Sequence, residues 1–235
     1  MSGLRQSGPL RMDESGGPLF AGLSDDKLSR IKALLRHRSF PAGANIISIE
    51  QPGEVVYIIL EGTVKIHIEQ ADGSDVILAI LGPGEIVGEM GPVEGLGRSA
   101  NVVTLEPTNM AWLDRAAFRE WLQNEPTLSY NVTRILSRRL RLANAQIQSL
   151  AALDVYGRVA RQILAFAQEY GEPVPDGGVC IPIRLTQSDM ADMVGASRVS
   201  VNKVLVHYKE RKYISVDPTF RITVHDHAAL AQRCS

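Results

Sequence analysis

The segment that decides the fold reads GEMGPVEGLGRSA and spans residues 88–100. It combines a carboxylate (Glu89), a guanidinium (Arg98) and a hydroxyl (Ser99) around a centre rich in glycine and proline. A carboxylate can hold a ribose 2'-hydroxyl, and a guanidinium can bond two phosphate oxygens at once. Glycines let backbone N–H groups approach an anion closely. The segment therefore predicts a nucleotide receptor, against the alternative of a surface salt bridge between Glu89 and Arg98 around an ordinary turn.

Short apolar segments separated by glycine turns surround this motif, between about residue 38 and residue 113. We expect strands at residues 46–50, 55–61, 63–69, 76–81, 100–104 and 109–113. Asp72-Gly73 is the clearest hairpin signal, because a tight turn between strands needs positive φ. Many short strands at such spacing are typical of a compact antiparallel roll or barrel.

The motif and its surroundings resemble the phosphate-binding cassette of the CRP/FNR family of bacterial transcriptional regulators. A methionine, Met90, replaces the family's leucine, and the matching positions are Gly88, Glu89, Arg98, Ser99 and Ala100. The resemblance implies an α+β protein with three parts. These are an N-terminal cyclic-nucleotide-binding β-roll of jelly-roll type, a long dimerisation helix and a C-terminal winged helix-turn-helix.

Length and composition agree with two globular domains. The chain has 235 residues, of which 45% are hydrophobic, and a formal net charge of −1. We find no apolar run long enough to cross a bilayer and no signal-peptide core at the N-terminus, so we expect a cytoplasmic protein without a membrane partner. The expected organisation is a flexible tail (1–18), the β-roll domain (19–124), the dimerisation helix (125–153) and the DNA-binding domain (154–235).

Cysteine and histidine usage gives no sign of a metal site. Cys180 and Cys234 are too few for a disulfide framework, and family members with an iron–sulfur cluster carry a group of cysteines near the N-terminus. His225 and His227 would share one face of a strand, but two ligands make a weak metal site. No axial-ligand pattern for haem can be singled out. We expect no metal cofactor.

Helical patterns flank the roll. Before it, an apolar face at helical spacing follows a cap at Ser24 or Asp25. That face consists of Leu28, Ile31, Leu34 and Leu35. After the roll, residues 115–123 predict a short helix, and Pro126 begins a longer one.

Along the longer helix, apolar residues recur at alternating intervals of four and three, which is a heptad seam. They are Leu136, Leu140, Ala143, Ile147 and Leu150. An amphipathic helix packed on its own domain would look similar over two turns. The resemblance favours a parallel dimer helix, because family members dimerise through this segment. The flanking arginines are then expected to stay mostly solvated: Arg134, Arg138, Arg139 and Arg141.

Capping signals predict three helices in the C-terminal part of the chain. Asp154 predicts the cap of a helix from residue 155 to about residue 170. Thr186 with Asp189 forms a capping-box pattern, Gly195 permits a tight turn, and Ser197 caps a second short helix. Two short helices joined through a glycine are typical of a helix-turn-helix, whose second helix lies in the major groove of DNA.

A predicted wing and a basic flank follow. Residues 213–216 and 220–224 alternate in polarity around a turn at 217–219. Between residues 198 and 221 there are six Lys or Arg against two acidic residues, although the whole chain carries −1. Basic charge is thus concentrated where phosphates would lie. The alternative is a small helical subdomain with a solvated basic face.

The second helix predicts how the DNA sequence is read. Arg198 can bond guanine O6 and N7. Val199 stands where the enteric family member has glutamate, so it cannot accept from cytosine N4 but can touch a thymine methyl. We therefore expect a two-fold symmetric operator that differs from the enteric site at that position. The expected DNA-binding residues are Thr186, Gln187, Ser197, Arg198, Val199, Ser200, Asn202 and Lys203.

Cyclic AMP is the first-choice effector. Ala143-Asn144 stands where the enteric member has a Thr-Ser pair that reaches the adenine; the amide can still read a purine edge, but one hydroxyl is lost. Such a loss costs about 1 kcal/mol. Cyclic GMP and cyclic di-GMP stay open, the latter with contacts from Arg134, Arg138 or Arg141. The expected ligand-binding residues are Gly88, Glu89, Met90, Arg98, Ser99, Ala100 and Asn144.

The sequence thus predicts an allosteric homodimeric regulator whose partners are an operator in double-stranded DNA and, if it activates, RNA polymerase. Target genes and the direction of regulation stay open. An enzyme that uses Glu89 as a base is one alternative, but no second catalytic group is placed near it by the sequence. A constitutive regulator that needs no ligand is the other.

Overall fold

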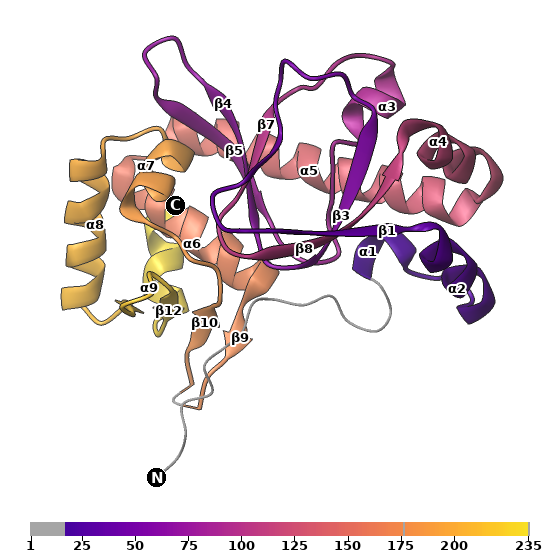
Figure 1. Ribbon diagram of the computed structural model, residues 1–235. Helices are drawn as coiled ribbons and strands as arrows, with labels where there is room; N and C mark the ends of the chain where they lie inside the picture. The colour runs from indigo at the N-terminus through magenta and orange to yellow at the C-terminus, as the bar shows by residue number, and fades with distance from the viewer. Residues whose placement is uncertain (1–16, 176, 235) are drawn as a thin grey trace. The chain divides into compact units, whose positions relative to one another are not determined.

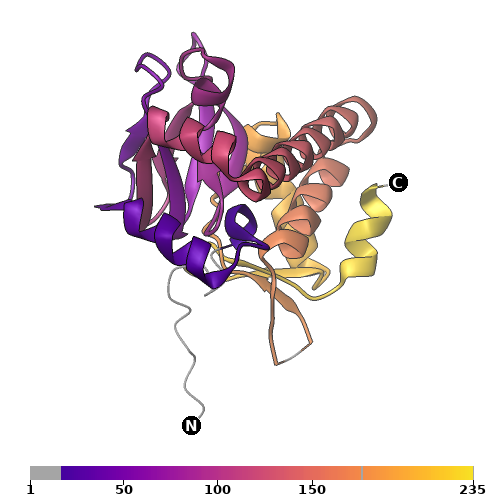
Figure 2. The same ribbon diagram turned by 90° about the vertical axis from the view of Figure 1, so that its right-hand side faces the viewer.

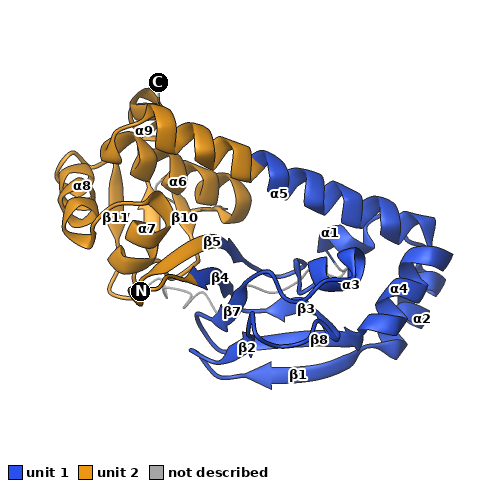
Figure 3. Cartoon of the chain, turned by 90° about the horizontal axis from the view of Figure 1, so that it is seen from above, with its two compact units in different colours: residues 1–68, 79–141 blue, residues 69–78, 142–235 orange. Residues whose placement is uncertain are grey.

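The computed structural model describes residues 17–175 and 177–234 of the chain. The fold is α+β and divides into two compact units, residues 1–68 with 79–141 (unit 1) and residues 69–78 with 142–235 (unit 2), as Figure 3 shows. Most of the expected tail, residues 1–16, lies outside the described residues. Its last two residues instead begin helix α1 (Gly17–Phe20), whose Leu19 and Phe20 are buried.

Two four-stranded sheets form the predicted roll (Figure 1). One has the order β1-β8-β3-β6, made of β1 (Arg36–Phe40), β8 (Thr108–Asp114), β3 (Val55–Glu61) and β6 (Ile86–Val87). The other has the order β2-β7-β4-β5, made of β2 (Asn45–Ile47), β7 (Asn101–Thr104), β4 (Val64–Glu69) and β5 (Asp75–Leu81). The predicted hairpin turn at Asp72-Gly73 is present, and the Gly73 amide donates to the Gln70 carbonyl at 2.9 Å.

Strand β3 shows how the two faces of the first sheet are filled. Successive side chains of a strand point to opposite faces. Val56 and Ile58 accordingly join a core shared with the helices of unit 1, whereas Tyr57 and Ile59 join the core that both sheets enclose. The continuous apolar run of β3 is therefore that of a strand covered on both faces.

Four helices cover the first of these faces: α1, α2 (Asp25–Leu34), α4 (Arg115–Asn124) and the first part of α5 (Pro126–Ala152). Helices α1 and α2 are indigo in Figure 2. The rings of Phe20 and Trp121 meet edge to face, with centroids 6.5 Å apart. The apolar face expected on α2 is only partly correct, because Leu34 is exposed. Ser24 precedes α2 but its side chain makes no capping hydrogen bond.

Some strand predictions were wrong. The strand expected at residues 46–50 ends at Ile47, because the Ile49 amide donates to the Asn101 side chain at 2.9 Å rather than to a neighbouring strand. Strand β1 was missed because its RHRSF sequence, four of whose five residues are exposed, shows no alternation of polarity. The short strand β6 was also missed.

Unit 2 contains a helical core and a third four-stranded sheet. The helices are α6 (Val155–Tyr170), α7 (Gln187–Val194), α8 (Arg198–Glu210), α9 (His227–Ala231) and the 3-10 turn η1 (Gln232–Cys234). The sheet has the order β11-β12-β10-β9, made of β11 (Ile214–Val216), β12 (Ile222–Val224), β10 (Val179–Ile181) and β9 (Glu172–Pro173). The expected wing is β11 with β12, and the sequence missed β9 and β10.

The predicted caps of unit 2 are confirmed. Asp154 accepts from the Gly157 amide at 2.8 Å, Thr186 and Asp189 form a reciprocal capping box, and Ser197 accepts from the Ser200 amide at 3.1 Å. Gly195 ends α7 in the left-handed conformation, with φ of 59°. These local signals position α7 and α8. Within the described ranges, we find no helix that has both the length and the hydropathy to cross a membrane.

Candidate nucleotide site and nucleic-acid interface

The segment at residues 88–100 folds into a short helix and a loop between β6 and β7. Its centre, expected only as a spacer, forms helix α3 (Met90–Glu94), which ends at Gly95 in the left-handed conformation. Gly91 of this helix packs against Gly53, so that a Cβ built on Gly53 would lie 3.5 Å from the Gly91 Cα. This close contact fixes the loop against the turn before β3.

Arg98 is held against the backbone of the roll. Its Nη1 donates to the Gly88 carbonyl at 2.9 Å and its Nη2 donates to the Val55 carbonyl at 2.8 Å. Its Nε is buried, and it finds no acceptor among the residues that the structure describes. Two donors thus fix the orientation of the guanidinium, and a third is left without a protein partner. A buried donor without a partner calls for an explanation such as a bound ion or water.

The guanidinium carries its charge into a partly buried place. Burial lowers the pKa of Arg98 below its ordinary value, and Tyr57, Glu54 and Glu89 partly oppose that shift. Desolvation disfavours the charged form of a group, and a nearby opposite charge favours it. A bound anion would therefore be stabilised at this position.

Glu89 is buried and paired with a residue of α5. Its side chain is 4% exposed, and its Oε1 accepts from Nη1 of Arg139 at 2.7 Å. Arg139 also donates through Nη2 to Glu85 Oε2 at 2.9 Å and to the Ile86 carbonyl at 2.6 Å. Arg138, the preceding residue, pairs with Glu85 through its own Nη2. Two buried carboxylates of the roll and two half-buried arginines of α5 thus form one charged cluster, which we call the α5 cluster: Glu85, Glu89, Arg138 and Arg139.

The expectation that Arg138 and Arg139 are mostly solvated was wrong. Their side chains are 28% and 21% exposed, because α5 brings them against the buried carboxylates of the roll. Buried charges in proteins are paired or hydrogen-bonded, and these arginines provide that pairing. Sequence reasoning missed Glu85 altogether, and no short-range pattern links it to α5.

The remaining residues of the predicted ligand set are placed as follows. Ser99 is exposed, and its hydroxyl donates to the Met90 sulfur at 3.5 Å. Ala100 is buried just before β7. Asn144 is exposed on α5, beyond the stretch of that helix that belongs to unit 1. The structure therefore brings together Gly88, Glu89, Arg98 and Ser99 within unit 1.

Gly88→Ala is expected to displace Arg98. Gly88 has φ of 81°, and a Cβ built on it would lie 2.5 Å from Arg98 Nη1 and 2.9 Å from Ile47 Cδ1. We expect nucleotide affinity, measured by calorimetry, to fall roughly tenfold or more. The matched control is Gly97→Ala, whose Cβ would meet no atom within 4 Å and which should fold like the wild type. Unchanged affinity of Gly88→Ala would show that the place of Arg98 does not matter for binding.

The predicted seam of α5 is largely exposed in the single chain. Leu140 and Ile147 are 62% and 64% exposed, and Ala143 and Leu150 are also exposed. Leu136 instead packs partly against the core of unit 1, together with the preceding apolar residues of α5. The first part of α5 is thus an amphipathic helix that packs on its own unit. The later part of α5 carries an exposed apolar stripe.

The helix-turn-helix presents two kinds of side chain. Val201, Val204 and Leu205 are buried, as expected for the inner face of α8. Those that point outward are Arg198, Val199, Asn202 and Lys203, which are exposed, and Ser200, which is half-buried. The hydroxyls of Thr186 and Ser197 are used in the caps described above.

One outward pair is hydrogen-bonded between the two helices. The Gln187 Nε2 donates to the Asn202 Oδ1 at 2.8 Å, which links the start of α7 to the outer face of α8. This bond fixes the orientation of both amides on the surface that was predicted to contact DNA. Sequence reasoning named both residues but not their pairing.

Two family models match separate ranges of the chain. A model described as a cyclic nucleotide-binding domain matches residues 37–125, and one described as a Crp-like helix-turn-helix domain matches residues 157–233. The first range contains the cassette with Glu85, and the second contains α7, α8 and the wing.

Whole-length similarity is found as well. The chain is 33% identical over 215 residues to the CRP-like cAMP-activated global transcriptional regulator of Mycobacterium tuberculosis H37Rv, covering 92% of this chain and 95% of that protein. It is 30% identical over 178 residues to the cAMP-activated global transcriptional regulator CRP of Escherichia coli O157:H7, covering 75% of this chain and 83% of that protein. The solved structure of FixK2 from Bradyrhizobium japonicum shares the fold, with a TM-score of 0.75 at 17% identity over 86% of this chain and 98% of that one.

Proposed function

The chain belongs to the CRP/FNR family of transcriptional regulators, and from this premise we propose that it is a homodimer whose operator binding is controlled by cyclic AMP. Two of the relatives described above are named as cAMP-activated global transcriptional regulators. A ligand can control DNA binding only if it favours the DNA-competent state over the other. The proposal therefore needs a ligand site, a path from it to α8, and a DNA-binding surface.

The single observation that carries the ligand proposal is the state of Arg98. Its guanidinium is fixed by two carbonyls, and its buried Nε has no acceptor among the described residues. We propose that a cyclic phosphate accepts from Arg98 and Ser99, that the ribose 2'-hydroxyl donates to Glu89, and that Asn144 reads the base. In this proposal Gly88 and Ala100 shape the backbone around the phosphate, and the Met90 side chain covers the bound nucleotide.

We propose that helix α5 transmits the effect of the ligand to α8. In unit 1 its Arg139 donates to the Glu89 carboxylate that the ribose is proposed to use, at 2.7 Å. In unit 2 its Gln146 donates to the Met193 carbonyl at 2.5 Å, and a Cβ built on Gly195 would lie 3.2 Å from Leu150 Cδ2. Ribose binding would change the pairing of Glu89 with Arg139. We propose that this change moves α5, and with it the turn before α8.

The exposed stripe of α5 supplies the dimer contact. A heptad stripe of apolar side chains is the pattern by which parallel helices associate. We propose that two chains pair through the exposed Leu140, Ala143, Ile147 and Leu150, together with the open side of the partly buried Leu136. This pairing would place two copies of α8 on one DNA duplex. Half-sites must then lie about 34 Å apart, so that small movements of α5 alter the fit.

Arg198→Ala is expected to weaken operator binding by about 1–3 kcal/mol and to relax the preference for guanine at one position. Fluorescence anisotropy with an operator obtained by binding-site selection measures both effects. Lys209→Ala is the control, because Lys209 is exposed in the last turn of the same helix and should change affinity without changing sequence preference. Selection of an identical site by Arg198→Ala would exclude a role for this residue in base reading.

Calorimetry with cyclic AMP, cyclic GMP and cyclic di-GMP in turn identifies the effector. Of the arginines suggested for extra contacts with cyclic di-GMP, Arg138 is already paired with Glu85, which favours the smaller ligand. The same panel in a DNA-binding assay tests control by the ligand. An operator shift of equal strength with and without every nucleotide would support a constitutive regulator instead.

A further inference from the structure

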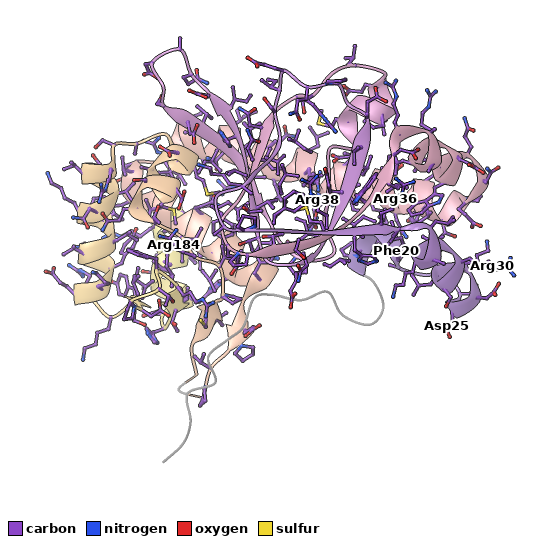
Figure 4. The ribbon with its side chains drawn as sticks, in the orientation of Figure 1. Phe20, Asp25, Arg30, Arg36, Arg38 and Arg184 are labelled. Carbon is purple, nitrogen blue, oxygen red and sulfur yellow. The ribbon has the colours of Figure 1, made fainter. Side chains whose placement is uncertain are left out.

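One exposed methionine lies at the proposed nucleotide site. Met90 is 40% exposed and is the first residue of α3, which is labelled in Figure 1. Sulfur atoms are yellow in Figure 4. Met110, Met190 and Met193 are 0%, 1% and 8% exposed. Within residues 17–175 and 177–234, Met90 is therefore the only methionine that solvent reaches freely.

The Met90 sulfur contacts a side chain that is proposed to bind the phosphate. The Ser99 hydroxyl donates to this sulfur, and the two atoms lie 3.5 Å apart. Ser99 is itself exposed, so small solutes can reach both groups. A thioether sulfur is only a weak acceptor, so a phosphate oxygen readily takes the hydroxyl from it. Ser99 is therefore available to a nucleotide as long as the sulfur stays a thioether.

The backbone on both sides of Met90 is held in place. The preceding Glu89 is buried and bonds Arg139 at 2.7 Å. The following Gly91 packs against Gly53, so that a Cβ built on Gly53 would lie 3.5 Å from the Gly91 Cα. Because the segment is fixed, a chemical change at the sulfur acts on the neighbouring hydroxyl instead of being relieved by a shift of the chain.

We propose that Met90 is an oxidation site whose sulfoxide weakens nucleotide binding, which makes the protein responsive to hydroperoxides. A sulfur lone pair attacks one oxygen of the hydroperoxide, so that the S–O bond forms as the O–O bond breaks. The sulfur loses two electrons and the peroxide gains them. For hydrogen peroxide, the transferred oxygen gives its proton to the departing hydroxide, which leaves as water. This inference rests on the proposed nucleotide binding.

The sulfoxide changes the hydrogen bonding of Ser99. Oxidation converts an apolar thioether into a polar group whose oxygen is a much better acceptor. This oxygen holds the Ser99 hydroxyl, which then no longer donates to the phosphate. Its partial negative charge also lies beside the place where an anion is proposed to bind. We expect the affinity for cyclic AMP to fall roughly tenfold or more, as the loss of one hydrogen bond to a charged group predicts.

Treatment of the full chain with hydrogen peroxide, followed by peptide mass spectrometry and calorimetry, tests the inference. Met90 should be oxidised before the three buried methionines, and saturating cyclic AMP should slow its oxidation, because the nucleotide is proposed to lie under its side chain. The affinity for cyclic AMP should fall roughly tenfold once Met90 is oxidised. Methionine sulfoxide reductases should restore that affinity.

Met90→Leu is the matched control, and each variant is compared with itself before and after peroxide. It lacks the oxidisable sulfur but keeps the other sulfur-containing residues, which include Met1 and Met12 outside the described residues, Cys180 and Cys234. Peroxide should leave its affinity for cyclic AMP unchanged. Ser99→Ala should lose less affinity on oxidation than the wild type, because the hydroxyl that the sulfoxide captures is gone.

The outcomes separate this inference from the proposed function. If the untreated wild type binds no cyclic nucleotide, the proposed function fails and this inference fails with it. If the wild type binds cyclic AMP equally well with Met90 reduced and fully oxidised, only the oxidation site is refuted. An equal loss of affinity in Met90→Leu would place the sensitive group elsewhere and would also refute it.

Discussion

Arg98→Ala is expected to lower the affinity for cyclic AMP about 100-fold or more, since it removes charge-assisted hydrogen bonds of about 1.5–3 kcal/mol each. The variant should still fold, because Arg98 is only half-buried and water can reach the carbonyls of Gly88 and Val55 in its place. Calorimetry measures the affinity, and unfolding in urea checks the fold.

Two other variants make this result specific. Arg98→Lys keeps the positive charge but loses the planar fork of donors, so it should bind more weakly than the wild type and more tightly than Arg98→Ala. Arg119→Ala removes an exposed arginine from α4 in the same unit and should bind normally. If Arg98→Ala bound cyclic AMP as the wild type does, the cassette assignment would be wrong.

Arg139→Ala is expected to destabilise unit 1 by roughly 3–5 kcal/mol, which is typical when one partner of a buried ion pair is removed. The substitution leaves Glu89 without the bond at 2.7 Å and Glu85 without the bond at 2.9 Å, and both carboxylates are almost fully buried. It also removes the donor to the Ile86 carbonyl, at 2.6 Å. Urea unfolding followed by circular dichroism gives the difference in free energy.

A compensating variant tests the cause of that loss. In Arg139→Ala with Glu89→Gln, the buried charge without a partner is gone, so part of the stability should return. Arg134→Ala, at an exposed position on the same helix, should change stability by less than about 0.5 kcal/mol. A change below about 1 kcal/mol in Arg139→Ala would show that the α5 cluster contributes little to folding.

Much of the fold could be predicted because its signals are local. Asp154, Thr186 with Asp189, and Ser197 each cap a helix from within three residues of their partners. The strands of the roll were found because turns with glycine separate them. Strand β1 was not found, since an exposed edge strand needs no apolar alternation.

The site was only half predictable. Glu89 and Arg98 lie in one short motif, and the structure places both within unit 1. The partners of Glu89 could not be predicted, because Arg139 is 50 residues away in the sequence and meets it only through the packing of α5.

The pairing of Glu89 with Arg139 gives the proposed control a physical basis. One carboxylate is shared between the proposed ribose site and α5, and it is 4% exposed. A ligand whose hydroxyl donates to Glu89 would therefore change the hydrogen bond between Glu89 and Arg139 of α5. Coupling between two sites requires such an element whose arrangement both sites influence.

The most direct test is a titration of a labelled operator with the protein, with and without saturating cyclic AMP, followed by fluorescence anisotropy. Cyclic AMP is expected to change the operator affinity of the wild type at least fivefold, since allosteric coupling is typically about 1–3 kcal/mol. The operator affinity of Arg98→Ala is expected to stay the same with and without the nucleotide. Equal wild-type curves with and without cyclic AMP, or the same response in both proteins, would exclude control of DNA binding through the Arg98 site.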